Sequence, residues 1–538
     1  MSSPQVLISG AGPTGLVLAL YLAKQGIRIR VIDKAKEAGT TSRAVVVHAR
    51  TLEFYQQLGM ADEILKRGLK SESFNLWVEG KQVASIPVTD MGTGLSPFPY
   101  VLIFPQDEHE KLLIDLLEKN GITVERETEL TEFTEKQNVI SAKVKTADGK
   151  EEIIRTEYLA GCDGAHSKVR DIIHTGFPGG TYDHIFYVAD VIANGPAVNG
   201  GVNVALDDSD FLGIFPMKNE GHARLIGTVI PSAAGSKKEL SWDDVKQVAI
   251  NRLKIKVEEI NWFSTYKVHH RVTEHFQQGR AFVLGDAAHI HSPVGGQGMN
   301  TGIGDAVNLA WKLAAVLKKQ APSSLLASYE IERMEFAKQL VRTTDRMFKL
   351  VTSTADFASF ARTKITPMII PLLFGRAATQ KWIFKRLSQI GIAYRNSPVS
   401  EGKAGLSAGE RLPWVKVSDK SFNFKYLTSL NWQIHVYGKV RPEIAKLCEK
   451  LKIKLHVFPW QSAMGKVGLV EHAVYLIRPD GHIAFADKKP SSLQIERYLA
   501  DRGFDFRPVN SQKTQTNHSH KSSGSSTPVF PISARPHR

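Results

Sequence analysis

Cysteine is almost absent from this 538-residue sequence, in which Cys162 and Cys448 stand alone. Two isolated cysteines exclude a disulfide framework, a four-cysteine zinc site and an iron–sulfur centre, and no C-x-x-C pair is present for dithiol chemistry. His289 and His291 are two residues apart but lack an acidic partner at ligand spacing, so we expect no metal site. This cysteine usage is typical of a reducing compartment, and we expect a cytoplasmic location.

Long hydrophobic runs are also missing. The apolar stretch 365–374 is interrupted by Pro367 and Pro371 and is much shorter than the roughly 20 residues of a membrane-spanning helix. The chain enters an apolar strand at Val6 without a charged leader, so we expect neither a secretory signal nor integral membrane association. The segment 364–386 has the mixed composition of an interfacial helix, but its prolines favour a buried helix pair that links two domains.

Charge of one sign does not dominate. Lys and Arg number 69 against 54 Asp and Glu, and the net charge is +15. This modest excess attracts anionic cofactors and substrates, whereas the basic stripe with interleaved aromatics of a nucleic-acid-binding protein is not visible. A hydrophobic content of 42% excludes disorder of the whole chain. Residues 511–538, rich in Ser, Thr, His, Gln and Pro, are expected to form a disordered tail.

The N-terminus carries a nucleotide-binding pattern. An apolar strand at 6–9 leads into Gly-Ala-Gly-Pro-Thr-Gly at 10–15 and then into a helix. In this pattern Gly10 permits a tight turn, Gly12 lets a pyrophosphate approach the backbone, and Gly15 packs the helix against the strand. A second strand ends at Asp33, where an acid binds a ribose hydroxyl. An acid at this position indicates FAD or NAD rather than NADP.

Two later segments decide between FAD and NAD. A strand near 158–161 ends at Asp163-Gly164, and the strand 281–284 ends at Gly285-Asp286, ahead of the glycine-rich stretch 293–302 and a long helix. An Asp at a strand end can bind sugar hydroxyls, and the free N–H groups of a helix start can hold anionic oxygens. One NAD does not need three such places, whereas an extended FAD does.

Together these motifs resemble the class A flavoprotein monooxygenases, the FAD-dependent aromatic hydroxylases. The resemblance implies that the first motif binds the ADP half of FAD, that Asp163 lies where both FAD and NAD(P)H pass, and that Gly285-Asp286 holds the ribityl chain. Arg50 opens the helix that follows Arg43 in this pattern. The cofactor-binding residues that the resemblance implies are Gly10, Gly12, Pro13, Thr14, Gly15, Asp33, Lys34, Arg43, Gln106, Asp163, Gly285, Asp286, Pro293, Gly298, Met299 and Asn300.

The C-terminal third sharpens the resemblance. Gly-Glu-Arg-Leu-Pro at 409–413 and Leu-Ile-Arg-Pro-Asp-Gly-His-Ile-Ala at 476–484 resemble parts of the thioredoxin-like domain of the phenol-hydroxylase-like and polyketide-hydroxylase-like branch. Only Cys448 lies there, so a structural role or a homodimer contact is implied.

The expected fold is α/β: a Rossmann-like, glutathione-reductase-like FAD-binding domain with an inserted β-sheet substrate domain and a C-terminal thioredoxin-like domain. The expected boundaries are 1–70, 107–175 and 271–396 for the FAD-binding domain, 71–106 and 176–270 for the substrate domain, 397–510 for the thioredoxin-like domain, and 511–538 for the tail.

The activity implied is that of a FAD-dependent monooxygenase, which uses NADPH or NADH and O2 to hydroxylate a phenolic or polycyclic substrate through a flavin C4a-hydroperoxide. The cofactor supplies the chemistry and the protein excludes water, so no catalytic triad is expected. The resemblance places Arg43 and Pro293 near the flavin ring. Phe215, Met217 and Arg224 are candidates for the substrate pocket, with ordinary sheet core as an equal alternative.

Other activities stay open. FAD-dependent epoxidation, Baeyer–Villiger-type insertion, and oxidase or dehydrogenase chemistry without oxygen insertion share this fold. A non-enzymatic FAD-fold protein that escorts lipidated GTPases would have lost the flavin-contacting residues, which are intact here. The paired-Trp motif of flavin halogenases is missing, and the cysteine count excludes a disulfide reductase.

Overall fold

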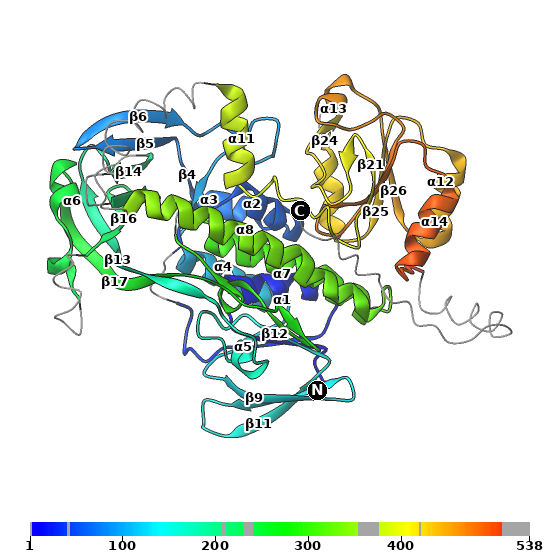
Figure 1. Ribbon diagram of the computed structural model, residues 1–538, viewed down its shortest axis with the longest axis horizontal. Helices are drawn as coiled ribbons and strands as arrows, with labels where there is room; N and C mark the ends of the chain where they lie inside the picture. Colours follow the sequence, from blue (N-terminus) through cyan, green and yellow to red (C-terminus); the bar gives the residue numbers. More distant parts are fainter. Residues whose placement is uncertain are drawn as a thin grey trace, which may run out of the picture.

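The computed structural model describes residues 3–39, 44–198, 200–206, 211–229, 240–293, 295–352, 376–418 and 421–507. Arg43, residues 364–375 of the amphipathic segment, and the 511–538 tail lie outside these ranges. Figure 1 shows a central α/β unit, a large sheet on its left, and a C-terminal α/β unit on its upper right. The predicted mixed α/β class is confirmed.

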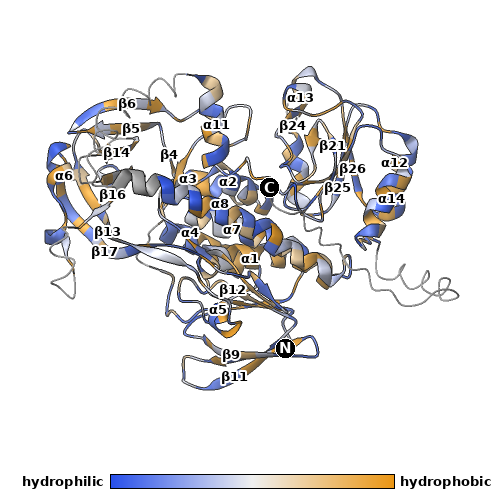
Figure 2. Ribbon diagram, in the orientation of Figure 1, coloured by the Kyte–Doolittle hydropathy of each residue, from blue (hydrophilic) through white to orange (hydrophobic). Residues whose placement is uncertain are grey.

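The central unit is built on a sheet with the strand order β18-β19-β12-β1-β2-β8, parallel from β19 to β8. β1 and β12 are entirely buried, because helices α1 and α7 pack above the sheet and the β9–β11 sheet lies below it (Figure 1). Both faces being covered explains why β1 reads as a continuous apolar run. In Figure 2 the hydrophobic colouring gathers on α1, α7 and these strands, where the largest core lies.

The strands of the central unit are β1 Val6–Ser9, β2 Ile29–Ile32, β3 Val46–Val47, β4 Leu69–Lys70, β7 Leu102–Ile103, β8 Val124–Glu125, β9 Glu129–Lys136, β10 Val139–Lys145, β11 Glu151–Thr156, β12 Tyr158–Gly161, β18 Gln277–Gln278 and β19 Ala281–Val283. Its helices are α1 Pro13–Lys24, α2 Ala49–Leu58, α3 Ala61–Arg67, α4 Gln106–Lys119, α5 Lys168–Ile172, η2 Gly285–Ala287, α7 Gly298–Leu317, η3 Ser323–Leu326, α8 Ala327–Thr352 and α11 Ala377–Leu387.

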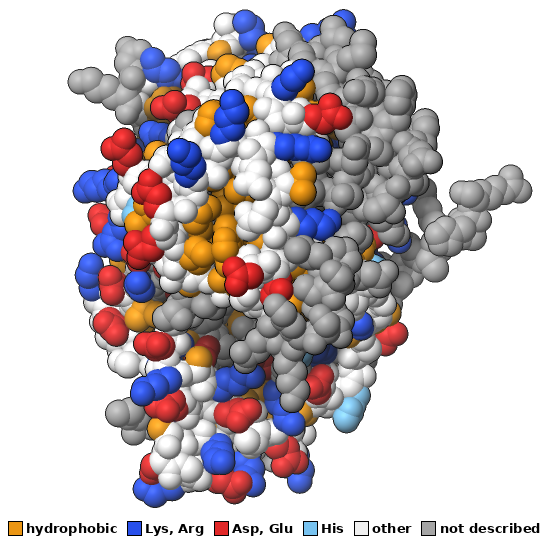
Figure 3. Space-filling model, turned by 90° about the vertical axis from the view of Figure 1, so that its left-hand side faces the viewer, with side chains coloured by type: hydrophobic (Ala, Val, Ile, Leu, Met, Phe, Trp, Pro, Cys, Tyr) orange, Lys and Arg blue, Asp and Glu red, His pale blue; other side chains and the backbone are white. Residues whose placement is uncertain are grey.

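The large sheet has eight strands in the order β20-β17-β13-β16-β15-β14-β5-β6. Its strands are β5 Ser73–Val78, β6 Lys81–Pro87, β13 Gly179–Asn194, β14 Val202–Leu206, β15 Phe211–Pro216, β16 His222–Thr228, β17 Lys256–Val272 and β20 His289–Ile290, and it is accompanied by η1 Trp242–Asp244 and α6 Val248–Arg252. One face packs on α6 through a core that includes Leu225 and Ile250. Figure 3 views this end of the molecule and shows hydrophobic side chains gathered at its centre, with charged side chains around them.

The C-terminal unit is a mixed sheet in the order β22-β21-β28-β27-β25-β26. Its strands are β21 Glu401–Ala404, β22 Leu406–Ser407, β25 Gln433–Tyr437, β26 Lys454–Phe458, β27 Val474–Ile477 and β28 Ile483–Asp487, with a hairpin of β23 Lys416–Ser418 and β24 Ser421–Phe422. Its helices are η5 Asn423–Ser429, α12 Pro442–Leu451, α13 Ser462–Lys466 and α14 Ser492–Asp501. The core under α12 and α14 continues into Trp311 and Ala315 of α7, so this unit is joined to the central unit by packing.

No helix in the described part of the chain is both long enough and apolar enough to cross a lipid bilayer.

Candidate cofactor site

Four chain segments end side by side at one edge of the central sheet. Ser9 of β1 lies in register with Ile32 of β2 and with Gly161 of β12. Gly161 in turn pairs with Val283 of β19. All four strands run parallel, so the turns that follow them meet at the carboxyl edge, which is where open α/β sheets bind ligands. The sequence motifs that follow these strands are thereby brought together.

The glycine-rich turn at this edge is shaped partly by packing and partly by open space. A Cβ on Gly10, whose φ is +105°, would lie 2.2 Å from the carbonyl oxygen of Cys162, and a Cβ on Gly15 would lie 2.0 Å from that of Gly10. A Cβ on Gly12 would meet nothing within 4 Å among the described residues. Gly12 caps α1 without a side-chain hydrogen bond, and Pro13 follows it. The turn is therefore open at Gly12, directly ahead of α1, and a helix start of this kind is a ready anion site.

Asp33 fastens this turn to β2. Its carboxylate accepts the N–H of Ala11 at 2.6 Å and that of Ala35 at 2.8 Å. The guanidinium of Arg126 lies 3.7 Å away, and its buried Nη2 has no hydrogen-bond partner among the described residues. Lys34 is exposed at the same corner. This corner thus combines the carboxylate of Asp33 with the guanidinium of Arg126, whose Nη2 can donate a further hydrogen bond.

Asp163 caps a short helix and leaves one oxygen over. Its Oδ2 accepts the N–H groups of Lys168 and Val169 at the start of α5, at 2.8 and 3.1 Å. Its Oδ1 is buried and has no hydrogen-bond partner in the described part of the chain. Burial raises the pKa of this carboxyl. A buried acceptor is normally hydrogen-bonded, so a donor from a bound molecule is expected here. The hydroxyl group of a sugar can supply that donor.

Thr14 holds the first turn of α1 against the turn at Gly285. A Cβ on Gly285, whose φ is +58°, would lie 2.7 Å from the Thr14 Oγ1, and a Cβ on Gly302 of α7 would lie 2.3 Å from it. The Gly285 N–H donates to Asp305 Oδ2 at 3.0 Å, and Asp286 is exposed beside it. Close packing of Gly285 and Gly302 against Thr14 thus joins the glycine-rich turn at 10–15 to the turn at Gly285.

Asn300 and His48 hold the glycine-rich loop that precedes α7. The Asn300 amide donates to the carbonyls of Val46 and Gly296, both at 2.9 Å, and its Oδ1 accepts the His48 N–H at 2.9 Å. Burial lowers the pKa of His48 to about 4. The neutral ring donates from Nε2 to the Gly295 carbonyl at 2.9 Å, since a carbonyl only accepts. His48 was not predicted as a site residue, although a lone histidine between the apolar Val46-Val47 and Ala49 is a usable signal.

Gln106 is the remaining cofactor candidate that contacts this region. At the start of α4, its N–H donates to the Ala44 carbonyl at 3.0 Å, and its side-chain amide donates to Glu110 at 2.8 Å. Gln106 therefore contacts Ala44, the residue directly after Arg43. Arg43 itself lies outside the described residues. Pro293, Gly298 and Met299 lie at the two ends of the loop that Asn300 holds.

Two of the three pocket candidates lie side by side, because Phe215 of β15 pairs with Arg224 of β16. Arg224 is 1% exposed and forms an ion pair with Asp190 at 3.0 Å, with its guanidinium 5.1 Å from the ring centre of Trp262. Phe215 is half-buried against the small cluster of Val45, Val46, Ile103 and Val202, and Met217 is half-buried directly after β15. Arg224 also donates to the Ala44 carbonyl at 3.5 Å and lies 4.0 Å from Asp107. Arg224 and Phe215 therefore both approach the residues next to the glycine-rich loop.

An aromatic row lines the same face of the large sheet, and sequence analysis missed it. The ring of Phe186 lies 6.5 Å from that of Phe211 and 6.1 Å from that of Tyr266, measured between centroids. Tyr182 continues the row, and its hydroxyl donates to Asp345 of α8 at 2.5 Å. The aromatic residues at 182 and 186 and at 211 and 215 were the available signal, because even spacing on a strand puts them on one face.

The residues at this edge fit an extended dinucleotide. An uncapped helix start suits a pyrophosphate, the spare donor and acceptor at Arg126 and Asp163 suit sugar hydroxyls, and the loop held by Asn300 lies beside the aromatic face. Within the described ranges, no cluster of three or more His, Cys, Asp or Glu side chains could hold a metal ion. His289 instead donates to Asp305 at 2.7 Å, and His291 lies 2.8 Å from the Ser292 carbonyl.

Comparison with known proteins gives consistent matches. The family described as FAD binding domain matches residues 3–344. The chain is 32% identical over 415 residues to 6-methylpretetramide 4-monooxygenase from Streptomyces rimosus, covering 76% of this chain and 72% of that protein. It is 30% identical over 511 residues to a flavin-dependent monooxygenase from Mycobacteroides abscessus, covering 92% and 99%. The structure of the OxyS anhydrotetracycline hydroxylase from Streptomyces rimosus superposes with a TM-score of 0.76 at 25% identity, over 94% of this chain and all of that one.

Proposed function

The chain belongs to the FAD binding domain family, and from that membership we propose that it is a FAD-dependent monooxygenase that hydroxylates a phenolic or polycyclic aromatic compound with NAD(P)H and O2. The observation that carries the proposal is the meeting of the glycine-rich turn, Asp33, Asp163 and the Gly285 turn at one sheet edge.

The chain's own residues have distinct tasks in this proposal. The first turn of α1 binds the pyrophosphate, Asp33 binds the adenosine ribose, and Asp163 accepts a hydroxyl of the cofactor at its unpaired Oδ1. Asp286 binds the ribityl chain, and the loop held by Asn300 lines the ring. When bound and reduced by NAD(P)H, FAD supplies the activation of O2. The protein orients the aromatic substrate and keeps water away from the reacting atoms.

The substrate lies against the aromatic face of the large sheet. Phe186, Phe211 and Tyr266 provide flat apolar surface, which favours an aromatic ligand through stacked and edge-to-face contacts. Phe215 connects this face with the residues beside the glycine-rich loop. The matched 6-methylpretetramide monooxygenase and anhydrotetracycline hydroxylase support a bulky aromatic substrate. Arg224, which pairs with Phe215 across the two strands and donates to the Ala44 carbonyl at 3.5 Å, remains a candidate for the same pocket.

We infer finer features of the architecture as well. The large sheet is the inserted substrate domain, in which β5 begins at Ser73, β13 begins at Gly179 and β17 ends at Val272. β20, however, adds a strand from beyond that limit. The C-terminal unit is a thioredoxin-like domain without dithiol chemistry, because Cys448 is its only cysteine. Burial also raises the pKa of this thiol to about 11. We further propose a cytoplasmic protein that forms a homodimer.

The test combines spectroscopy with product analysis. The purified chain should show flavin absorption bands, oxidise NADPH or NADH faster when phenols or polycyclic aromatics are added, and release a product that has gained one oxygen atom as a hydroxyl group. A lactone or epoxide product would instead establish one of the alternative insertions. A chain that stays colourless after incubation with FAD would overturn the proposal.

A further inference from the structure

A buried charge network joins the C-terminal unit to the turn at Gly285. Its charged side chains are at most 3% exposed. The cations are Lys312, Arg333 and Arg478, and the anions are Asp305, Glu332 and Asp480. Burying this many charges is expensive unless every one is paired and hydrogen-bonded. The arrangement of the partners therefore constrains how α7, α8 and the C-terminal unit sit against one another.

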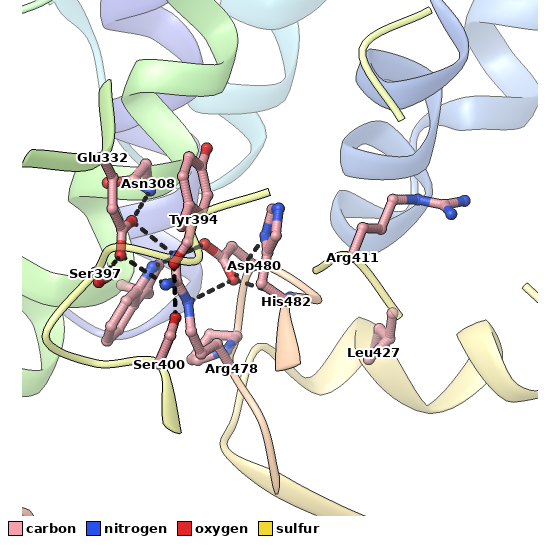
Figure 4. Close-up of polar contacts among 12 residues, drawn as sticks. Asn308, Glu332, Tyr394, Ser397, Ser400, Arg411, Leu427, Arg478, Asp480 and His482 are labelled. Carbon is pink, nitrogen blue, oxygen red and sulfur yellow. Dashed lines mark hydrogen bonds and ion pairs between the residues drawn. The ribbon is translucent and has the colours of Figure 1, made fainter. Parts of the chain in front are cut away.

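The end of the network in the C-terminal unit is the loop between β27 and β28, residues 478–482. Arg478 donates to both oxygens of Glu332 on α8, at 2.7 and 3.0 Å, and pairs with Asp480 in its own loop. Asp480 accepts the indole N–H of Trp311 on α7 at 3.2 Å. Figure 4 shows Glu332, Arg478 and Asp480 meeting between the helices and this loop, beside the ring of Tyr394. The loop thus holds α7 and α8 at the same time.

Glu332 is the centre of these contacts. Besides Arg478 it accepts hydrogen bonds from Lys312 at 2.9 Å, Asn308 at 2.6 Å and Ser397 at 2.6 Å. Burial alone would raise the pKa of Glu332, but the cations of Arg478 and Lys312 hold it at about 2. The carboxylate is therefore ionised and has several donors, which is the condition for a buried charge to be ordered.

The other end of the network reaches the cofactor edge. Arg333, next to Glu332 on α8, donates to Asp305 Oδ1 at 2.6 Å, to the Tyr394 hydroxyl at 2.9 Å and to the Thr301 carbonyl at 3.0 Å. Asp305 uses its Oδ2 to accept the Gly285 N–H at 3.0 Å. The position of that backbone turn is therefore set by a carboxylate whose orientation depends on α8.

We propose that the 478–482 loop positions the flavin-binding turn at Gly285, acting through Glu332, Arg333 and Asp305. The inference rests on the proposed function, because it takes Gly285-Asp286 as the ribityl-binding turn. A second set of contacts supports it. Arg50, at the start of α2, donates to the Asp480 carbonyl at 2.6 Å, and Gln57 donates to the Pro479 carbonyl at 3.1 Å. The loop thus also supports the helix that begins at the His48–Asn300 contact. The C-terminal unit is accordingly part of the cofactor site, without touching the cofactor.

The test uses the full chain and the variant Arg478→Met, which keeps an unbranched apolar stem but removes both ion pairs. Arg497→Met is the matched control, since Arg497 lies on α14 of the same unit and is 81% exposed. FAD is removed and then titrated back while its fluorescence is followed. We expect the Kd for FAD to rise at least about tenfold in Arg478→Met, the loss that follows from one weakened charge-assisted hydrogen bond, and to be unchanged in Arg497→Met.

Hydrogen exchange of the cofactor-free chain gives a second measurement that activity does not influence. The Gly285 amide should exchange faster in Arg478→Met, while the Gly10 amide, which donates to Ile32 at the same sheet edge, serves as the internal reference. Equal acceleration at both amides would mean general loosening and would overturn the proposal, as would an unchanged Kd with unchanged exchange. If Arg478→Met aggregates, Glu332→Gln replaces it, with the same expected and contrary results. Failure of the wild-type chain to bind FAD would contradict the proposed function instead.

Discussion

Gly10 and Gly12 stand two residues apart, yet substitution by alanine should affect different properties of the protein. At Gly10 a Cβ would lie 2.2 Å from a backbone carbonyl oxygen, and the backbone is in the left-handed region. At Gly12 a Cβ would meet nothing within 4 Å among the described residues, and φ is −77° with ψ −179°, which alanine adopts freely. Gly10→Ala should therefore damage the fold, whereas Gly12→Ala should spare the fold and impair cofactor binding.

The magnitudes follow from these contacts. For Gly10→Ala, a left-handed residue costs about 1–2 kcal/mol and overpacking against rigid backbone about 1–3 kcal/mol, so a loss of roughly 2–5 kcal/mol in the free energy of unfolding is expected. For Gly12→Ala, the change should stay within about 1 kcal/mol and can be stabilising, because alanine restricts the unfolded chain. Its methyl group keeps a pyrophosphate from one helix N–H, and a lost charge-assisted hydrogen bond of about 1.5–3 kcal/mol weakens FAD binding roughly 10- to 150-fold.

Two assays separate the effects. Thermal unfolding of the cofactor-free chains should place Gly12→Ala within a few degrees of the wild-type midpoint or above it, and Gly10→Ala well below it. Fluorescence titration with FAD should then show the weakened binding of Gly12→Ala. Wild-type affinity in Gly12→Ala would refute the claim that the open space ahead of α1 receives the pyrophosphate.

Three further predictions concern other parts of the molecule. Phe211→Ala should raise the KM for an aromatic substrate roughly tenfold with FAD binding unchanged, whereas Phe263→Ala, on the opposite face of the sheet, should leave KM unaltered; steady-state kinetics on both variants decides this. The pKa of Glu332 is lowered to about 2 in the folded chain, so this group contributes stability above its ordinary pKa near 4.5 that is lost as the pH falls toward 2. Denaturant unfolding across this range should lose less stability in Glu332→Gln than in wild type, and equal losses would contradict the assignment. Cys448→Ala should leave NAD(P)H oxidation unchanged, because the thiol lies on the buried face of α12 and has no partner cysteine, and an altered rate would show that the thiol takes part in the reaction.

Much of the cofactor edge could be predicted because its signals are local. A short apolar strand, a glycine that permits a tight turn and an acid at the next strand end are neighbours in sequence, as in Val6 to Gly15 and Ile32-Asp33. Parallel pairing then brings such segments together without further information. The α/β class followed for the same reason, since strand and helix periodicities alternate along the chain.

What sequence analysis missed depends on contacts between distant segments. Nothing local indicates that Arg224 pairs with Asp190, which lies on the neighbouring strand. Lys312, Glu332 and Arg478 look like ordinary surface charges, and only the packing of three elements shows that they are buried together. His48 was overlooked because its partner Gly295 is far along the chain.

The adjacency of β12 and β19 has a practical consequence. The two strands are hydrogen-bonded neighbours, although everything from β13 to β17 lies between them in the chain. The intervening segment therefore leaves the central unit and returns to it at neighbouring strands of the same sheet. Chimeras can exchange this segment, together with the β5–β6 hairpin that pairs with it, between relatives. Such chimeras should take on the substrate specificity of the donor protein, while the central unit and its cofactor site stay unchanged.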